Sequence, residues 1–270
     1  MEGEGKVVSV SQLCRWFSVP RSSLYYRPRP RRATSFDPDV VTAVRQVIGT
    51  HPTYGVPRIT ACIRKSLSRP VNHKKVRRIV RAHDWQVKQR PKGWRPRVPR
   101  WRSVAAHPNT RWAIDITHFF CGRDGWSHLV AIIDCCDRTL VGWRLSSSGK
   151  ANIAVAALEE ALSVRDIQMG HDLTIRSDNG LVFGSKAFTK LVNAYHLKQE
   201  YITPYTPEQN GMIERFFRSL KEECVWQHRF DNRDHAFREV SNWIDHYNEH
   251  RPHSALGYLS PKEFGQKIAA

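Results

Sequence analysis

The spacing of apolar residues divides the chain into a helical first half and a second half that begins with strands. Before residue 88, apolar positions recur at helical spacing, whereas from Arg111 onward they alternate with polar ones, as in a half-buried strand. Pro, Gly and Asn separate the periodic segments. The first half is predicted to hold helices on both sides of a break at residues 18–20, and over 39–48, 57–67 and 72–83.

The second half is predicted to mix strands and helices. Its first three strands read as an antiparallel meander, and helices and strands alternate after them. This order resembles that of a ribonuclease H-like domain. The predicted strands span 112–120, 128–134, 140–145, 173–176 and 198–201, and the predicted helices span 152–163, 185–195, 212–225 and 234–250, with a tail after them.

The length of 270 residues suggests two domains, at roughly 150 residues each. We predict a helical basic region over 1–87, a linker rich in Pro, Arg and Trp over 88–109, and a ribonuclease H-like domain with a C-terminal helix and tail over 110–270. The predicted class is α/β: a mixed five-stranded sheet with flanking helices, preceded by an all-α region of helix-turn-helix type.

The positive charge of the chain lies entirely in its first half. The formal charge is +18, and residues 1–110 hold 24 Lys/Arg against 5 Asp/Glu, while residues 111–270 hold 19 against 20. So many Lys and Arg suit neutralisation of phosphates, which makes nucleic acid the expected partner of the first half. A basic solvated surface without a ligand is the alternative.

The helix predicted over 72–83 is the main candidate for contact with the DNA backbone. Val76, Ile79 and Val80 form an apolar face opposite a strongly basic one. The candidate DNA-binding residues are Lys74, Lys75, Arg77, Arg78 and Arg81 on this helix and Arg95 and Arg97 in the linker. The pair of short helices around residues 18–20 also has helix-turn-helix spacing, which alone is a weak indication.

Several classes of protein are excluded. The sequence has no run of about 18 uncharged apolar residues, and its first ten residues carry Glu2, Glu4 and Lys6, so neither a membrane span nor a secretory signal is expected. Its six cysteines form no C-x-x-C pair, which argues against a disulfide framework or a structural zinc site. We expect a cytoplasmic protein with free thiols.

Three carboxylates lie where a catalytic site would need them. Asp115 is in the middle of a predicted strand, Asp178 follows the carboxyl end of another, and Glu214 is in the first turn of a helix. A charge inside an apolar strand is costly unless it faces a polar site or a cation. Lys221 lies two helical turns after Glu214 on the same helix face.

These carboxylates could hold two Mg²⁺ or Mn²⁺ ions and so support displacement at a phosphodiester. Taken singly, each has a structural alternative: a core-edge charge for Asp115, a turn residue for Asp178 and a helix N-terminal charge for Glu214. Other acidic residues compete for the role, namely Asp134, Asp137, Asp245 and Glu249.

The second half resembles the D-D-E catalytic cores of retroviral integrases and bacterial insertion-sequence transposases. Thirty-five residues separate Asp178 from Glu214, a spacing typical of that group, and Lys221 matches its basic residue. Further matches are the W-x-x-D-I-T and V-G-W segments at 112–117 and 141–143, the Y-N-x-x-R-P-H-S-A-L-G-Y tail at 247–258, and the H-P-T-Y-G and V-N-x-K-x-V segments at 51–55 and 71–76.

The resemblance implies a transposase that cuts element ends to free 3′-hydroxyls and joins them to target DNA. It implies that Asp115, Asp178 and Glu214 are metal ligands, that Lys221 contacts DNA, and that a homo-oligomer holds two terminal inverted repeats. The chain departs from the family in two ways. It lacks the zinc module of retroviral integrases, so binding of the element ends is expected to use helices. It also lacks the leucine heptads that the upstream frame of such elements often supplies, so a fusion or partnership with that product is expected. The alternatives are a non-catalytic DNA-binding regulator and a structure-selective nuclease.

Overall fold

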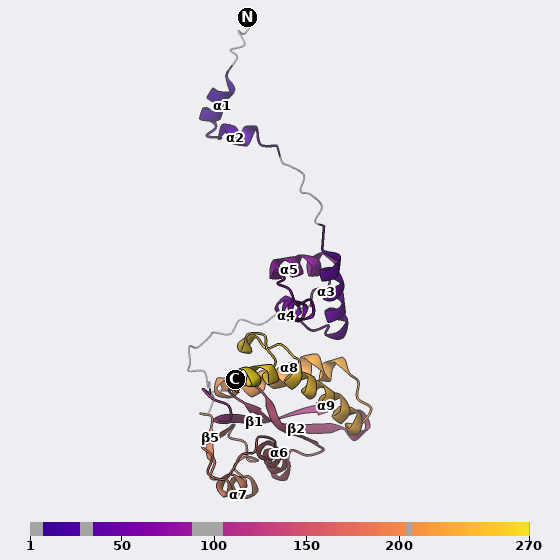
Figure 1. Ribbon diagram of the computed structural model, residues 1–270, viewed down its shortest axis with the longest axis vertical. Helices are drawn as coiled ribbons and strands as arrows, with labels where there is room; N and C mark the ends of the chain where they lie inside the picture. Colours follow the sequence, from indigo (N-terminus) through magenta and orange to yellow (C-terminus); the bar gives the residue numbers. More distant parts are fainter. Residues whose placement is uncertain (1–7, 28–34, 88–104, 204–206, 270) are drawn as a thin grey trace, which may run out of the picture. The chain divides into compact units, whose positions relative to one another are not determined.

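A computed structural model describes residues 8–27, 35–87, 105–203 and 207–269. The chain divides into two compact units, residues 1–37 and 38–270. The first unit holds α1 (Val10–Trp16) and α2 (Arg21–Leu24), which lie on either side of the predicted break and bury none of their residues (Figure 1). Ser9 and Gln12 form a capping box at the start of α1.

The second unit begins with three helices: α3 (Pro38–Thr50), α4 (Val56–Ser66) and α5 (His73–Ala82). Local chemistry determines where they begin. A proline stands at the start of α3 and within the first turn of α4, and the Asn72 side chain accepts a hydrogen bond from Lys74 N at 2.9 Å to cap α5. All three predicted helices are confirmed.

A mixed five-stranded sheet forms the centre of the core, as predicted. The strand order is β3-β2-β1-β4-β5. The first three strands pair antiparallel, and β1 and β4, like β4 and β5, pair parallel. The strands are β1 (Arg111–Phe120), β2 (Trp126–Asp134), β3 (Leu140–Ser146), β4 (Thr174–Ser177) and β5 (Lys198–Tyr201).

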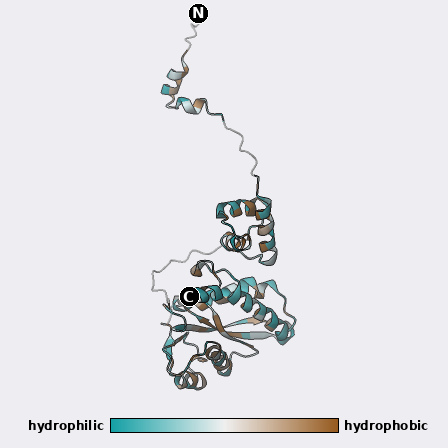
Figure 2. Ribbon diagram, viewed as in Figure 1, coloured by the Kyte–Doolittle hydropathy of each residue, from teal (hydrophilic) through white to brown (hydrophobic). Residues whose placement is uncertain are grey.

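Helices cover both faces of this sheet (Figure 1). Apolar residues of α8 (Gly211–Glu223) and α9 (Arg233–Glu249) form one hydrophobic cluster with Ala113 and Leu129 of the strands. On the opposite face, α6 (Ala151–Val164) and α7 (Lys186–Ala194) form a second cluster with Ile114 and Val130. Figure 2 shows apolar residues gathered on the strands of the sheet.

The V-G-W segment in β3 is explained by close packing of a helix. A Cβ atom on Gly142 would lie 2.5 Å from the backbone oxygen of Ala157 in α6. Only glycine therefore lets α6 approach β3 this closely.

The tail contains a helix that the sequence analysis did not predict, α10 (Pro261–Ala269). A local indication was present. Ser260 and Glu263 exchange hydrogen bonds between backbone and side chain, which is a capping box, and a proline follows the capping serine.

The predicted domain boundaries at residues 87 and 109 remain a prediction. Most of the predicted linker, including Arg95 and Arg97, lies outside the described residues. In the part of the chain that the structure describes, no helix is long and apolar enough to cross a membrane.

Candidate active site

Asp115 lies on the central part of the sheet, on the side that α8 covers. Side chains alternate along β1, so Asp115 shares a side with Ala113 and Phe119, both of which belong to the cluster with α8. Its side chain is half-buried, and its Oδ1 accepts a hydrogen bond from Ile116 N at 2.7 Å. The strand thus holds a carboxylate in a largely apolar setting.

Asp178 follows directly after β4, the parallel neighbour of β1. Gly180 N donates to Asp178 Oδ1 at 2.9 Å, and a Cβ atom on Gly180 would lie 2.8 Å from the same oxygen. Asn179 donates from its side chain to the Ile202 carbonyl at 3.0 Å, which ties this turn to the end of β5. The turn therefore holds Asp178 at the carboxyl end of the parallel strands, where α/β sheets place their sites.

Glu214 and Lys221 come from α8. Ile213, Phe217 and Leu220 of this helix are buried in the cluster against the sheet. Glu214 is exposed in the first turn and Lys221 is half-buried two turns later. Packing of the apolar face of α8 thus determines where these two charges lie.

The charges around Asp115 show that these residues share one environment. The pKa of Asp115 is raised to about 7, mainly by burial, and the hydrogen bond from Ile116 opposes this rise. The negative charges of Asp178 and Glu214 also raise the pKa, and the positive charge of Lys221 lowers it. The structure therefore brings the four residues that the sequence singled out into one electrostatic neighbourhood.

The carboxylates of Asp115, Asp178 and Glu214 are suitable ligands for a divalent cation, but they do not form a preformed metal site. Within residues 8–27, 35–87, 105–203 and 207–269, no group of three or more His, Cys, Asp or Glu side chains could hold a metal ion as placed. Carboxylate oxygens are the ligands that Mg²⁺ and Mn²⁺ prefer. A bound cation would offset both the burial and the neighbouring negative charges that raise the pKa of Asp115.

The competing acidic residues have structural roles or lie elsewhere. Asp134 is fully buried and accepts three hydrogen bonds from groups around it. Asp137 pairs with Arg165 at 2.7 Å. On α9, Asp245 is exposed and Glu249 pairs with a lysine of α10.

Arg176 is a residue near the site that the sequence analysis missed. It lies on β4, and its side chain is only 9% exposed. It donates to both carboxylate oxygens of Glu200 on β5, at 3.2 and 2.9 Å, and to the Gln209 carbonyl at 2.9 Å, just before α8 begins. It thus connects the strand that leads to Asp178 with the segment that leads to Glu214. A charged residue inside a buried strand was the available indication.

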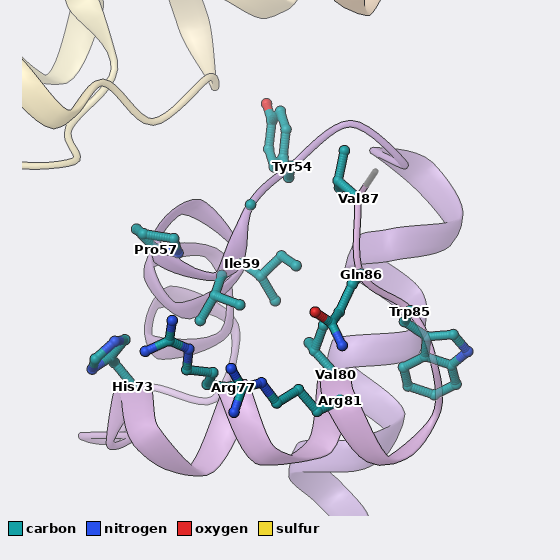
Figure 3. A pocket seen from close by; sticks show the side chains of 12 residues that line it. Tyr54, Pro57, Ile59, His73, Arg77, Val80, Arg81, Trp85, Gln86 and Val87 are labelled. Atoms are coloured by element: carbon teal, nitrogen blue, oxygen red, sulfur yellow. The ribbon is translucent and has the colours of Figure 1, made fainter. Parts of the chain in front are cut away.

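The basic face predicted on α5 is present. Val76, Ile79 and Val80 are buried, while Lys74, Arg77, Arg78 and Arg81 are exposed and Lys75 is half-buried. A cavity of about 310 Å³ opens beside this helix. Figure 3 shows Tyr54 at the top of the cavity, Pro57 and His73 at the left, and Arg77 and Arg81 below.

The chain matches two kinds of protein family. Two models described as integrase core domain match residues 105–207 and 195–261, and a model described as HTH-like domain matches residues 38–93. The integrase core matches together span more than half of the chain. The chain therefore contains an integrase core domain, with an HTH-like domain before it.

Its relatives come from insertion elements. The chain is 27% identical to the insertion element IS476 uncharacterized 39.2 kDa protein of Xanthomonas euvesicatoria, over 95% of this chain and 72% of that protein. It is 28% identical to transposase InsD for insertion element IS2D of Escherichia coli (strain K12), over 84% of this chain and 78% of that protein.

A solved structure supports the fold. A chain in the cryo-EM structure of a simian T-cell lymphotropic virus intasome, in complex with PP2A regulatory subunit B56 gamma, aligns with a TM-score of 0.50 and 18% identity. The alignment covers 82% of this chain and 73% of that one.

Proposed function

We propose that this protein is a transposase that cuts DNA at the ends of an insertion element and joins the freed ends to target DNA. The observation that carries the proposal is the neighbourhood of Asp115 in an integrase core domain. The charges of Asp178, Glu214 and Lys221 all shift the pKa of this carboxylate. The relationship to an insertion-element transposase supports it.

The reaction divides into two displacements at phosphorus. In the first, a water oxygen attacks the phosphodiester at an element end, the P–O3′ bond breaks, and a 3′-hydroxyl and a 5′-phosphate remain. In the second, that 3′-hydroxyl oxygen attacks a target phosphodiester, whose own P–O3′ bond breaks as the new bond forms. The hydroxyl proton passes to solvent, and a 3′-hydroxyl is left on the target strand.

Each site residue has a role in this proposal. Asp115, Asp178 and Glu214 would hold two Mg²⁺ or Mn²⁺ ions, which when bound supply Lewis-acid activation of the attacking and leaving oxygens. Lys221 would hold a DNA phosphate beside them, since a flexible ammonium is a suitable point charge for phosphate. The exposed cations of α5 would hold the DNA backbone.

The proposal also concerns partners and location. Holding two element ends requires at least two copies of the chain, so we expect a homo-oligomer on DNA. The product of an upstream reading frame would join it as a fusion or as a partner. The place of action would be the bacterial cytoplasm, at the nucleoid.

The test is nicking and joining of labelled duplexes that carry the sequences flanking the gene, with Mg²⁺. Asp178→Asn and Glu214→Gln should each lower the cleavage rate by at least roughly 100-fold, because each removes a ligand that stabilises charge in the transition state. DNA affinity should remain. Glu222→Gln is the matched control, since Glu222 lies on the same helix and pairs with Arg218 at the surface.

Three results would contradict the proposal in different ways. Cleavage retained in both ligand variants would rule out the assigned residues. Binding without cleavage, by this chain and by its upstream-frame fusion, would favour the regulator. Cleavage without joining would favour the nuclease.

A further inference from the structure

The H-P-T-Y-G segment at 51–55 has no part in the proposed reaction, yet it makes long-range contacts. It forms the turn between α3 and α4, and Tyr54 is only 2% exposed. The Tyr54 hydroxyl lies 2.9 Å from His246 Nε2 on α9. The His51 ring stacks on Tyr54 and on His246, with both centroid distances 4.6 Å. This turn of the HTH-like region therefore packs on the core.

A buried carboxylate joins the same two regions. Glu223, at the end of α8, accepts from Arg58 Nη1 on α4 at 2.8 Å. It also accepts two hydrogen bonds from Arg251 in the tail, each at 2.7 Å. The Glu223 side chain is 8% exposed, that of Arg251 3% and that of Arg58 30%. Burial opposes ionisation of Glu223, but the hydrogen bonds and charges of Arg251 and Arg58 outweigh it and lower the pKa.

Other contacts extend this junction. Arg58 lies over the Tyr54 ring, 5.3 Å from its centroid. Lys65, further along α4, forms an ion pair with Glu263 of α10. Three elements of the core, namely α8, α9 and the tail, thus contact the turn before α4 or α4 itself. Residues 38–270 accordingly form one compact unit.

The catalytic helix runs into this junction. Glu223 lies nine residues after Glu214, which corresponds to about 13.5 Å along α8. The same rigid helix therefore carries a proposed catalytic carboxylate near one end and the carboxylate that receives Arg58 at the other.

We propose that the HTH-like region and the catalytic core of one chain work as a single rigid unit joined through Glu223, so that the bound DNA meets the active site at a fixed spacing. Glu223 and Arg58 are positioning residues in this proposal, because neither needs to touch the reacting atoms. The part about spacing rests on the proposed transposase function.

Arg58→Gln is the informative variant. It removes the ion pair between α4 and α8 but leaves the Arg251 pair of Glu223 intact, so the core keeps its buried charge neutralised. Glu223→Gln would leave a buried arginine without a counter-charge and could simply unfold the protein. Arg58→Lys keeps the charge and tests for rescue. Arg69→Gln is the control, since Arg69 pairs with Asp39 inside the HTH-like region at 3.6 Å.

The first measurement is calorimetric unfolding of the full chain, which needs no DNA. The wild type, Arg58→Lys and Arg69→Gln should unfold the HTH-like region and the core in one transition. Arg58→Gln should split this into two, because the ion pair no longer joins the two regions. Two transitions in the wild type would overturn the inference of a single unit. One transition in Arg58→Gln would overturn the inference that the pair of Arg58 with Glu223 joins the two regions.

The second measurement maps nick positions to the nucleotide on duplexes carrying the flanking sequences. Arg58→Gln should bind them as the wild type does, but nick at least about fivefold more slowly and at several neighbouring phosphodiesters. Arg58→Lys should restore a single position. Unchanged rate and position in Arg58→Gln would overturn the inference about spacing. If neither the wild type nor its upstream-frame fusion nicks, the proposed function fails, and calorimetry still decides whether the two regions are joined.

Discussion

Single residues around the site owe their properties to burial and to a few partners. Arg176 is such a residue: it is buried on β4 and holds Glu200 and the Gln209 carbonyl. Its three hydrogen bonds cannot be replaced by an apolar side chain of similar length. They connect the strand before Asp178 to the segment before α8.

We therefore expect Arg176→Met to lower the free energy of unfolding by about 1.5–3 kcal/mol, the range for hydrogen bonds that involve charged groups. Cleavage should also slow, because the start of α8 is no longer anchored. Denaturant unfolding measures the first effect. Arg144→Met is the control: Arg144 is 43% exposed and pairs with Glu160, and such surface pairs contribute under about 1 kcal/mol. Equal destabilisation of the two variants would show that the hydrogen bonds of Arg176 are unimportant.

The lowered pKa of His246 predicts how the stability of the protein depends on pH. Its pKa is lowered from 6.5 to about 4, mainly by burial, with a contribution from the nearby positive charges of His51 and His250. Between these values the unfolded chain takes up a proton that the folded chain does not. The free energy of unfolding should therefore fall as pH falls from about 6.5 towards 4. The charged groups that face His246 are His51, His250, Glu223 and Arg251, and Tyr54 is its hydrogen-bond partner.

The variant His246→Gln keeps a hydrogen-bonding group for Tyr54 but does not titrate. Between pH 7.5 and pH 5 the wild type should lose more stability than this variant, by on the order of 1–2 kcal/mol once partial solvent exposure is allowed for. Denaturant unfolding at the two pH values gives the difference. His171→Gln, at an exposed position, should behave as the wild type does. An identical pH dependence in His246→Gln would contradict the prediction.

At the scale of elements, α5 has one side that packs in the helical region and another that is available to DNA. Its apolar side packs on α3 and α4, and its basic side remains exposed. A helix that is anchored on one side and charged on the other can hold a DNA backbone without rearranging.

Replacing Arg77 and Arg78 by Gln should weaken DNA binding regardless of sequence. For each phosphate that the variant no longer neutralises, the slope of log affinity against log salt should become shallower by roughly 0.9. Fluorescence anisotropy over a range of salt concentrations measures this slope. Arg144→Gln on β3 provides the control for removal of a surface charge. A slope unchanged in the double variant would move the main DNA-binding surface away from α5.

At the scale of the whole molecule, the two compact units on either side of residue 37 differ in how much they bury. The described helices α1 and α2 bury no residue, and Trp16, Phe17 and Tyr26 are each at least 68% exposed. Residues 38–270 hold both hydrophobic clusters. Stability should therefore reside in the second unit.

Removal of residues 1–37 should shift the thermal unfolding midpoint of the remaining chain by less than about 2 °C, since α1 and α2 contribute no buried residue. DNA affinity should fall, because the removed segment is rich in Arg. Calorimetry and anisotropy on the shortened chain test the two expectations. A lower midpoint by many degrees would show that α1 or α2 packs on the second unit.

The sequence by itself determined most elements, the α/β class and the positive charge of the first half, because apolar periodicity, caps and charge are properties of neighbouring residues. It also singled out four site residues: Asp115 as a charge inside an apolar strand, Asp178 at a strand end, and Glu214 and Lys221 by their positions and spacing on one helix. It could have indicated α10, whose capping box is local.

Only the tertiary structure decided which distant groups meet. Arg176 contacts Gln209, and Glu223 contacts Arg58 165 positions away in the chain. No periodicity or spacing encodes such pairs, because they depend on how the sheet and helices bring separate segments together. The same packing gives Asp115 its raised pKa, since burial and the approach of Asp178 and Glu214 exist only in the folded chain.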